Sequence, residues 1–310
     1  MQRRMLAWAG SAALAVAALA PAAAQAAPTA AAAPTAATAA CALGLGSFNQ
    51  VRGHDSRVIT ATAPPTISAA ISTPDLYTTP YSVSQPTTFT AVPAGSGKTT
   101  RTGKVVYGAG YLYESSYTVG TDGKVVGTPV FRRIGNGWGG RFLIQSQYKA
   151  SATSKPTRTM LYQQDQYGLF GRWTDVGKGL RITGYVTGMS TMKSFALIAS
   201  TPTYDTFLAN NRAGALYTVK IPTTTPLKPI ITPVRTSSWQ GFEQLVAAPC
   251  GKTGSILLGI DKDTHTGYLY AVGPANGTKT VIKGLGKVPL TFTDWDYFRF
   301  APQYDPLNGA

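Results

Sequence analysis

The sequence has few acidic residues and very few glutamates and histidines, and these shortages narrow the functions open to it. Its 310 residues include 13 Asp and Glu against 28 Lys and Arg, so the formal net charge is +15. The glutamates are Glu114 and Glu243, and the histidines are His54 and His265. Glycosidases need two facing carboxylates, and Ser-His-Asp catalysis needs a placed histidine. We therefore predict a protein that is not an enzyme.

Long runs of one residue type are also missing beyond the N-terminal region. No five consecutive like charges occur, so the basic excess is spread out. Such a charge favours attraction to polyanionic cell-envelope polymers, and no nucleic-acid partner is predicted. No later apolar stretch is long enough for a transmembrane segment. Gly and Pro interrupt every window that could hold an amphipathic helix, which indicates an all-β chain.

Residues 1–26 have the pattern of a bacterial-type export signal. Arg3 and Arg4 form a basic start, an apolar stretch follows over residues 5–20, and Ala24-Gln25-Ala26 is a small-x-small cleavage site. The two arginines leave Sec and twin-arginine export both open. We expect a protein that is secreted and works outside the cell.

The remainder divides into a short linker and one large domain. Residues 27–40 are almost all Ala, Pro and Thr, too poor in bulky apolar side chains to pack, and we expect them to be disordered. Residues 41–310 are long enough for one large core, and we predict that they form a single β-propeller domain.

A two-part pattern recurs along this domain: a strand with a Phe, then Leu-Tyr or Leu-Phe completed 22 to 29 residues later. The Phe residues are Phe48, Phe89, Phe142, Phe195 and Phe242, and the pairs are Leu76-Tyr77, Leu112-Tyr113, Leu169-Phe170, Leu216-Tyr217 and Leu269-Tyr270. Such a period predicts repeated β-units. In the fifth unit, turn residues separate four short β-rich segments, which indicates a four-stranded meander.

The repeat predicts a five-bladed β-propeller of four-stranded antiparallel blades. A sixth aromatic strand, within residues 292–300, would then pair beside the N-terminal strand and lock the ring. Six blades are the alternative. The first unit is rich in Pro, so its outer strands should be short edges. The two cysteines of an exported chain are expected to pair, and a Cys41–Cys250 disulfide would pin the N-terminal segment near the closure of the ring.

Several segments resemble the repeats of the tachylectin-type propeller lectins. Arg133-Ile-Gly-Asn-Gly-Trp138 and Ser238-Trp239-Gln-Gly-Phe242 are similar to the first part of that repeat, and Gly267-Tyr-Leu-Tyr-Ala-Val272 is similar to the second. The resemblance is strongest over residues 130–302. It implies a secreted propeller without catalysis that binds amino-sugar glycans in pockets between blades. Unlike the near-identical blades of that family, these units differ from one another.

The predicted ligand-binding residues are tryptophans that could stack on a sugar ring, with neighbouring Asp and Asn side chains that could bind its hydroxyls. They are Trp138 with Asn136, Trp173 with Asp175, Trp239, and Trp295 with Asp296. A Trp at the head of a blade strand can instead pack between sheets. Trp173 follows Phe170 by three residues, so the two side chains should lie on opposite faces of their strand.

One segment has the alternation of a calcium loop. Asp261, Asp263 and His265 occupy alternate positions before a Gly, but His is a poor calcium ligand. A hairpin turn needs the same residue types. We predict no metal and no cofactor, and the sequence leaves open whether these three residues bind one.

The sequence as a whole predicts a lectin-like propeller that recognises cell-envelope or extracellular glycans. Two alternatives stay open. One is a secreted glycan-degrading hydrolase with a carboxylate pair at the mouth of the channel, formed either by Glu114 and Glu243 or by two Asp residues. The other is a protein-interaction propeller whose basic surface meets an acidic partner.

Overall fold

The computed structural model describes residues 40–79, 82–165, 167–177 and 179–310. The predicted export signal and all of the predicted linker except residue 40 lie outside these ranges. Ala39–Ala310 form one compact unit. Its described residues form 22 β-strands and no α-helix. The all-β prediction is therefore confirmed, and the described part of the chain contains no helix that could cross a bilayer.

Three sheets of the described residues each contain four antiparallel strands that follow one another in the chain. The first contains β10 (Phe142–Tyr148), β11 (Arg158–Gln164), β12 (Phe170–Asp175) and β13 (Leu180–Val186). The second contains β14 (Met192–Ser200), β15 (Tyr204–Asn211), β16 (Leu216–Pro222) and β17 (Ile230–Arg235). The third contains β18 (Gln244–Cys250), β19 (Gly254–Asp261), β20 (Thr266–Val272) and β21 (Ile282–Lys287).

The remaining strands join into one ten-stranded sheet with the order β3-β2-β1-β22-β6-β7-β8-β9, in which β4 also pairs with β2 and β5 with β7. The strands are β1 (Ala42–Phe48), β2 (His54–Thr60), β3 (Thr66–Ile67), β4 (Ile71–Thr73), β5 (Val83–Ser84), β6 (Phe89–Pro93), β7 (Thr99–Tyr107), β8 (Tyr111–Val119), β9 (Val130–Gly135) and β22 (Tyr297–Pro302). The sheet is antiparallel except at its middle, where β22 and β6 run parallel.

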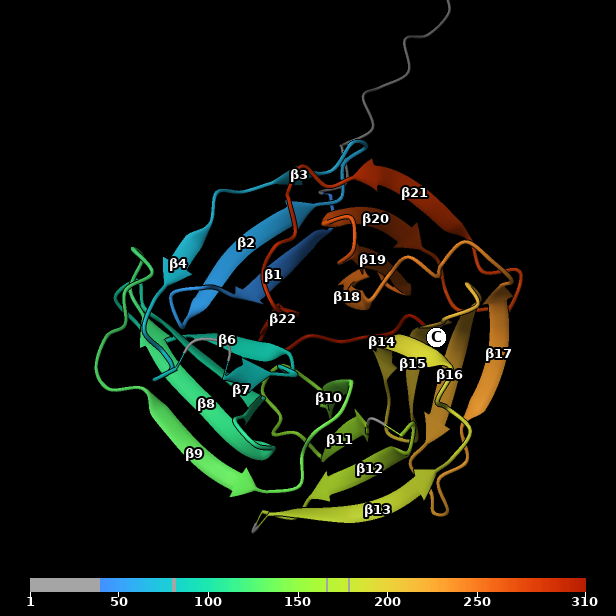
Figure 1. Cartoon of the computed structure of the whole chain (residues 1–310), viewed down its shortest axis with the longest axis horizontal. Helices are drawn as coiled ribbons and strands as arrows, with labels where there is room; N and C mark the ends of the chain where they lie inside the picture. Colours follow the sequence, from blue (N-terminus) through green and yellow to red (C-terminus); the bar gives the residue numbers. More distant parts are fainter. Residues whose placement is uncertain (1–39, 80–81, 166, 178) are drawn as a thin grey trace, which may run out of the picture. The chain divides into compact units, whose positions relative to one another are not determined.

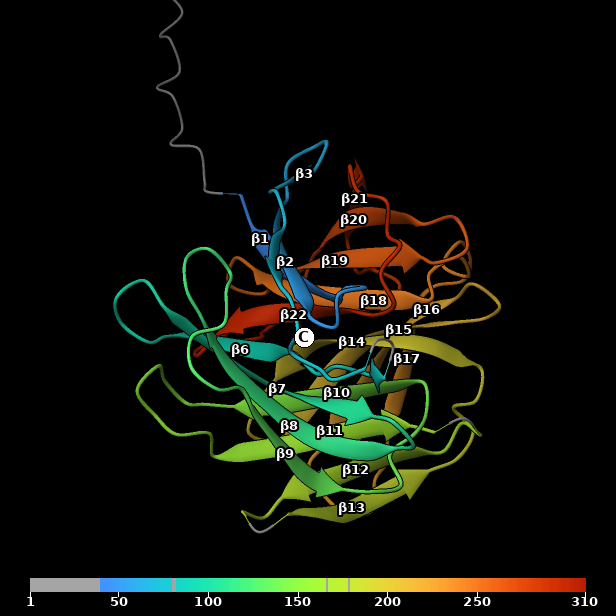
Figure 2. The same cartoon turned by 60° about the vertical axis from the view of Figure 1, so that its left-hand side comes forward.

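The sheets surround a common centre, as Figure 1 shows. Strand β14 contacts β10 on one side and β18 on the other, and β22 contacts both β18 and β6. This radial arrangement is that of a β-propeller. The C-terminal strand β22 pairs antiparallel with the N-terminal strand β1, with Gly46 opposite Phe298 (Figure 2). The predicted closure of the ring by the last aromatic strand is confirmed.

The repeated phenylalanines belong to the core, and two of the five lie over a glycine of the adjacent strand. A Cβ atom added to Gly103 would lie 2.5 Å from the ring of Phe89. The same construction at Gly259 would meet the ring of Phe242 at 2.8 Å. Only glycine leaves room for this close approach of ring and backbone. The phenylalanines of the repeat therefore hold the sheets together.

The prediction for the first unit is partly wrong. Leu76 and Tyr77 do not lie in a strand but in a bend between β4 and β5. Tyr77 is nevertheless buried, because its ring packs against Phe48 and His54, and its hydroxyl lies 2.9 Å from Nε2 of His54. The outer strands β3 and β4 have two and three residues. Their shortness is as expected for this Pro-rich segment.

The disulfide between Cys41 and Cys250 is present, with the two Cα atoms 5.4 Å apart. Cys41 lies just before β1, and Cys250 ends β18. The bond therefore joins the N-terminal strand to the sheet that precedes it around the ring, as the sequence predicted.

His54 makes the stability of this core depend on pH. The side chain has no exposed surface, and its Nδ1 lies 2.6 Å from the hydroxyl of Tyr117. Burial, and then the charge of Arg101, lower the pKa of His54 well below its ordinary value of 6.5. Below pH 6.5 the unfolded chain takes up a proton that the folded chain does not, so stability is lost as the pH falls.

We expect the free energy of unfolding to fall with a slope approaching 1.4 kcal/mol per pH unit (about one proton) below pH 6.5. Urea unfolding across this window measures the slope. His54→Gln should reduce the slope, whereas His265→Gln, at an exposed site, should leave it unchanged. An equal slope in wild type and His54→Gln would show that His54 is not responsible.

Candidate functional site

Two of the predicted tryptophans lie in the core. Trp138 and Trp239 are each 6 % exposed. Trp138 packs on Trp173 with ring centroids 4.8 Å apart, and Trp239 packs on Tyr270 at 4.9 Å. Both rings fill the space between sheets, so neither offers a face to a sugar. This corrects their prediction as ligand-binding residues.

Trp173, Asn136 and Asp175 line neither of the cavities that Trp295 borders. Trp173 is half-buried against Trp138, on the opposite side of its sheet from Phe170, as expected from their spacing. Asn136 is exposed in the loop before Trp138. Asp175 is exposed, and its Oδ1 accepts a hydrogen bond from the backbone N–H of Gly177 at 2.9 Å, as in an ordinary turn.

Trp295 differs from the other tryptophans because 55 % of its surface is exposed. It lies in the loop that leads into β22, between two anchored carboxylates. Asp294 accepts a hydrogen bond from the Ser47 hydroxyl at 2.5 Å, and burial raises the pKa of this carboxyl. Asp296 accepts from the backbone N–H of Gln85 at 3.1 Å. The loop is thus fixed on both sides of the exposed ring.

A series of hydrogen bonds and ion pairs surrounds the mouth of the central channel and includes Asp296. Its Oδ1 pairs with Nζ of Lys262 at 3.1 Å, and this ammonium also donates to the carbonyl of Trp295 at 2.8 Å. The backbone N–H of Lys262 donates to Oε2 of Glu243 at 2.8 Å. The other oxygen of Glu243 pairs with Lys193 at the start of β14.

The circuit is completed on the side of β10. Arg141 donates from Nη1 to the carbonyl of Ser190 at 2.9 Å and to that of Met192 at 3.3 Å. Nε2 of Gln85 donates to the carbonyl of Gly140 at 3.0 Å. These links connect the loops of Gln85 and Lys262 with the residues that precede or begin β10, β14 and β22. Hydrogen bonds and ion pairs therefore hold the side chains at the mouth in place.

The mouth groove is the cavity of about 520 Å³ that Trp295 borders. Its other charged or titratable side chains are Arg141, Lys262, His265, Asp294 and Asp296. Four lining residues (Gln85, Arg141, Lys262 and Asp296) also line a cavity of about 140 Å³ in the channel itself. An aromatic face next to fixed donors and acceptors of both charges is suited to a ligand with both apolar and hydroxyl-bearing faces.

Three carboxylates lie close together beside this groove. Oxygen atoms of Glu243, Asp261 and Asp263 all lie within 4.8 Å of one another. Glu243, rather than the predicted His265, is therefore the third residue of this group, and His265 Nδ1 lies 3.2 Å from the carbonyl oxygen of Phe292. Both oxygens of Glu243 already have partners. We assign no metal to this cluster.

The two glutamates do not face each other. Glu243 lines the channel cavity, where the hydrolase alternative required it. Glu114 lies on β8 and pairs with Arg132 of β9 at 3.1 Å, in the outer part of its sheet. A catalytic pair that combines the two glutamates is therefore excluded by this structure.

Sequence reasoning identified Trp295 and Asp296 but missed Arg141, Lys262 and Gln85. Arg141 directly precedes the repeated Phe142, and Lys262 lies in the turn before the fifth Leu-Tyr pair. Position relative to the repeat was therefore the available signal, since loops at one end of every sheet converge on the same mouth.

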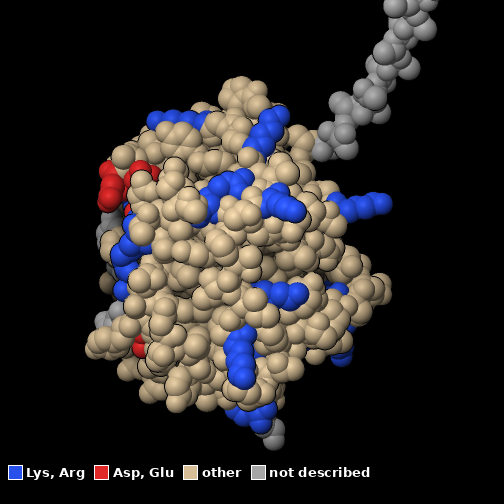
Figure 3. Space-filling model, turned by 90° about the vertical axis from the view of Figure 1, so that its right-hand side faces the viewer, with Lys and Arg blue, Asp and Glu red and all other residues tan. Residues whose placement is uncertain are grey.

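Over the side of the molecule in Figure 3, Lys and Arg are spread out and acidic side chains lie near one edge.

Comparisons with known proteins add similarities of fold only. No family model matches the sequence. No curated protein matches it significantly. Three solved structures are similar to this chain.

The fucose-specific lectin from Aleuria aurantia has 12% identity, with 77% of this chain and 76% of that chain covered and a TM-score of 0.44. The catalytic domain of a GH62 α-L-arabinofuranosidase from Coprinopsis cinerea has 13% identity, with 66% and 72% covered and a TM-score of 0.39. The WD40 domain of SCAP from fission yeast has 10% identity, with 80% and 61% covered and a TM-score of 0.35. At these values none of the similarities indicates what this chain binds.

Proposed function

We propose that this protein is a non-catalytic carbohydrate-binding propeller whose ligand lies against Trp295 in the mouth groove. The observation that carries the proposal is the exposure of Trp295, 55 % of its surface, on a loop anchored at both flanking carboxylates. An exposed aromatic face held beside fixed polar groups is typical of binding sites. The ligands are cell-envelope or extracellular glycans.

We propose that the domain that carries this site is a five-bladed propeller. In the ten-stranded sheet, β22, β1 and β2 with β3 and β4 would be one blade, and β6 to β9 another. A Cβ atom on Gly46 of β1 would lie 2.4 Å from the ring of Phe298 in β22, which repeats the contacts of Phe89 with Gly103 and of Phe242 with Gly259. This supports β22 as an inner strand, in agreement with the resemblance to tachylectin-type lectins.

The chemistry of the chain supports a role outside the cell. The disulfide fits an oxidising compartment, as does the export signal predicted from the sequence. The net charge of +15 favours acidic polymers as part of the target. The resemblance to the lectins adds amino-sugar glycans to the ligands that should be tested.

The hydrolase alternative finds less support in the mouth groove. A general base needs a free carboxylate oxygen directed at the substrate, and a general acid needs a protonated carboxyl directed at it. Oε1 of Glu243 pairs with Lys193, and Oε2 accepts from the backbone of Lys262. Asp296 is likewise held by Lys262 and Gln85. These hydrogen bonds and ion pairs support a structural role of both carboxylates at the mouth.

A glycan array probed at low and high salt tests the function. The proposal predicts saturable binding to a defined set of glycans that persists at high salt, without release of reducing sugar. Binding that disappears at high salt would favour the charge-driven alternative, because screening weakens exposed charge interactions. Release of reducing sugar would favour the hydrolase. Binding to no glycan would contradict the proposal.

Trp295→Ala should weaken the binding of an array-selected glycan by about tenfold or more, because the stacking face is lost. Tyr185→Ala is the matched control, since Tyr185 is 65 % exposed on β13 and lies outside the groove. Isothermal titration measures both dissociation constants. Equal losses in the two variants would show that Trp295 has no special role.

A further inference from the structure

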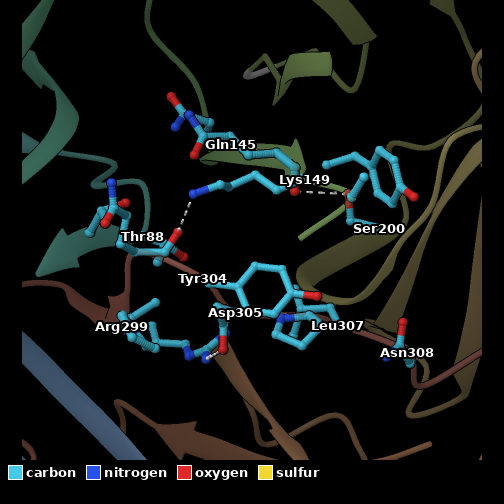
Figure 4. A pocket seen from close by; sticks show the side chains of 17 residues that line it. Thr88, Gln145, Lys149, Ser200, Arg299, Tyr304, Asp305, Leu307 and Asn308 are labelled. Atoms are coloured by element: carbon cyan, nitrogen blue, oxygen red, sulfur yellow. Dashed lines mark hydrogen bonds and ion pairs between the residues drawn. The ribbon is translucent and has the colours of Figure 1, made fainter. Parts of the chain in front are cut away.

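A second polar cavity lies at the other end of the central channel. The mouth groove and its channel cavity are lined by residues at the beginnings of β10, β14 and β22. This cavity is lined instead by later residues of the same strands, which are Gln145 and Gln147 of β10, Ser200 of β14, and Ala301 and Pro302 of β22. Its volume is about 290 Å³, near the lower end of ordinary ligand pockets. Figure 4 shows Gln145, Lys149 and Arg299 around it.

The C-terminal segment gives this cavity a fixed wall. The backbone N–H of Ser200 donates to the carbonyl of Leu307 at 3.0 Å, and that of Gly309 donates to Ile198 at 2.9 Å. The segment therefore adds a short stretch of pairing to the edge of β14. Leu307 is buried and borders both this cavity and the channel cavity behind the mouth groove. Thr88 and Arg299 also border both cavities, so the two cavities adjoin along the channel, whereas the mouth groove shares no residue with this one.

The walls present cationic donors. Arg299 is only 7 % exposed, and its Nη2 pairs with Asp305 at 2.6 Å. Its buried Nε has no hydrogen-bond partner among the described residues. Lys149 forms no ion pair within the described part of the chain, and its Nζ is 3.4 Å from the carbonyls of Ala152 and Gln303. Asp305 neutralises one of these two cations, so the cavity has an excess positive charge.

A buried lysine orients a further donor. Lys104 is 7 % exposed, and its Nζ donates to Oε1 of Gln145 at 2.5 Å. Because the oxygen of this amide is occupied by the ammonium, the NH₂ group of Gln145 is the part left for a ligand. The remaining polar lining supplies hydroxyls and amides from Thr88, Tyr304 and Asn308, whereas the Ser200 hydroxyl already donates to the carbonyl of Gln147. The cavity thus combines anion-binding donors with groups that can bind hydroxyls.

We propose that this cavity is a binding site for a small sugar acid, whose carboxylate lies between Lys149 and Arg299 and whose hydroxyls contact Gln145 and Tyr304. A charged donor pair binds a carboxylate more strongly than neutral donors would. The volume fits one monosaccharide unit rather than an oligosaccharide. The site shares no residue with the mouth groove. The proposal therefore stands independently of the proposed function.

Isothermal titration with D-glucuronate at low salt tests the site, with D-glucose and inorganic phosphate as comparison ligands. The expected result is saturable binding of glucuronate, with glucose and phosphate each about tenfold weaker or more. Binding of glucose as tight as glucuronate would overturn the role of the charge. Binding of phosphate as tight as glucuronate would overturn the assignment to a sugar acid. Absence of glucuronate binding would overturn the site.

Lys149→Gln should weaken glucuronate binding by about tenfold or more, because a charge-assisted contact is lost. Lys228→Gln, at an exposed lysine outside the cavity, is the matched control and should bind as wild type does. Trp295→Ala should also leave glucuronate binding unchanged, which separates this site from the glycan site. Arg299→Lys provides a second test, with its melting curve showing that it is folded. Wild-type affinity in both Lys149→Gln and folded Arg299→Lys would contradict the proposal.

Discussion

Replacing Asp205 with Ala is expected to lower the free energy of unfolding by about 3–5 kcal/mol, the loss typical of a broken buried ion pair. Asp205 lies in β15 with no exposed surface. Its carboxylate accepts from Nη1 and Nη2 of Arg158 at 2.5 and 2.7 Å, from the Tyr162 hydroxyl at 2.6 Å and from the Ser146 hydroxyl at 2.6 Å. Without it, Arg158 would be largely buried without a counter-charge.

The effect on stability arises because this carboxylate joins two sheets. Arg158, Tyr162 and Ser146 lie on β11 and β10, whereas Asp205 lies on the neighbouring sheet. Urea unfolding followed by fluorescence measures the loss. Asp175→Ala, at an exposed aspartate, should change stability by no more than about 0.5 kcal/mol. A loss below about 1 kcal/mol in Asp205→Ala would show that the pair does not hold the sheets together.

Replacing both cysteines with Ala is expected to cost about 5 kcal/mol of stability. The disulfide joins residues separated by 209 positions, and in the chain-entropy model a loop of that length loses this much freedom in the unfolded state. Cys41 and Cys250 also pack against the core cluster that contains Leu43 and Ile256, so the bond holds β1 against the sheet of β18.

The free energy of unfolding of the Cys41→Ala/Cys250→Ala variant, compared with oxidised and reduced wild type, tests this. Reduced wild type should match the double variant and differ from the oxidised protein. A double variant as stable as oxidised wild type would show that β22 closes the ring without help from the disulfide.

Much of the fold could be predicted because it depends on local patterns. Short β-rich segments, turn residues between them and the repeated Phe and Leu-Tyr elements indicated radial four-stranded sheets, and the pairing of β22 with β1 followed from the extra aromatic strand. The failure at Leu76-Tyr77 has a physical reason. Tyr77 is buried through its contact with His54 rather than through a strand, and a residue pattern records burial without showing which backbone provides it.

The site could be predicted only in part, because it depends on contacts between distant loops. Trp138, Trp239 and Trp295 occupy similar positions before a Phe of the repeat, yet only the third is exposed. The difference lies in what the neighbouring sheet places over each ring, which the local sequence does not contain. The contacts of Asp296 with Lys262 and Gln85 join residues up to 211 positions apart, so no local pattern could indicate them.

Acrylamide quenching of tryptophan fluorescence, with and without an array-selected glycan, tests the location of the glycan site most directly. Of the tryptophans in the described residues, Trp295 is the exposed one, so it should account for most of the quenching of wild type. Trp295→Ala should therefore be quenched much less than wild type. The account predicts that bound glycan lowers the quenching of wild type to that of the variant. Saturating glycan that leaves the quenching of Trp295 unchanged would contradict it.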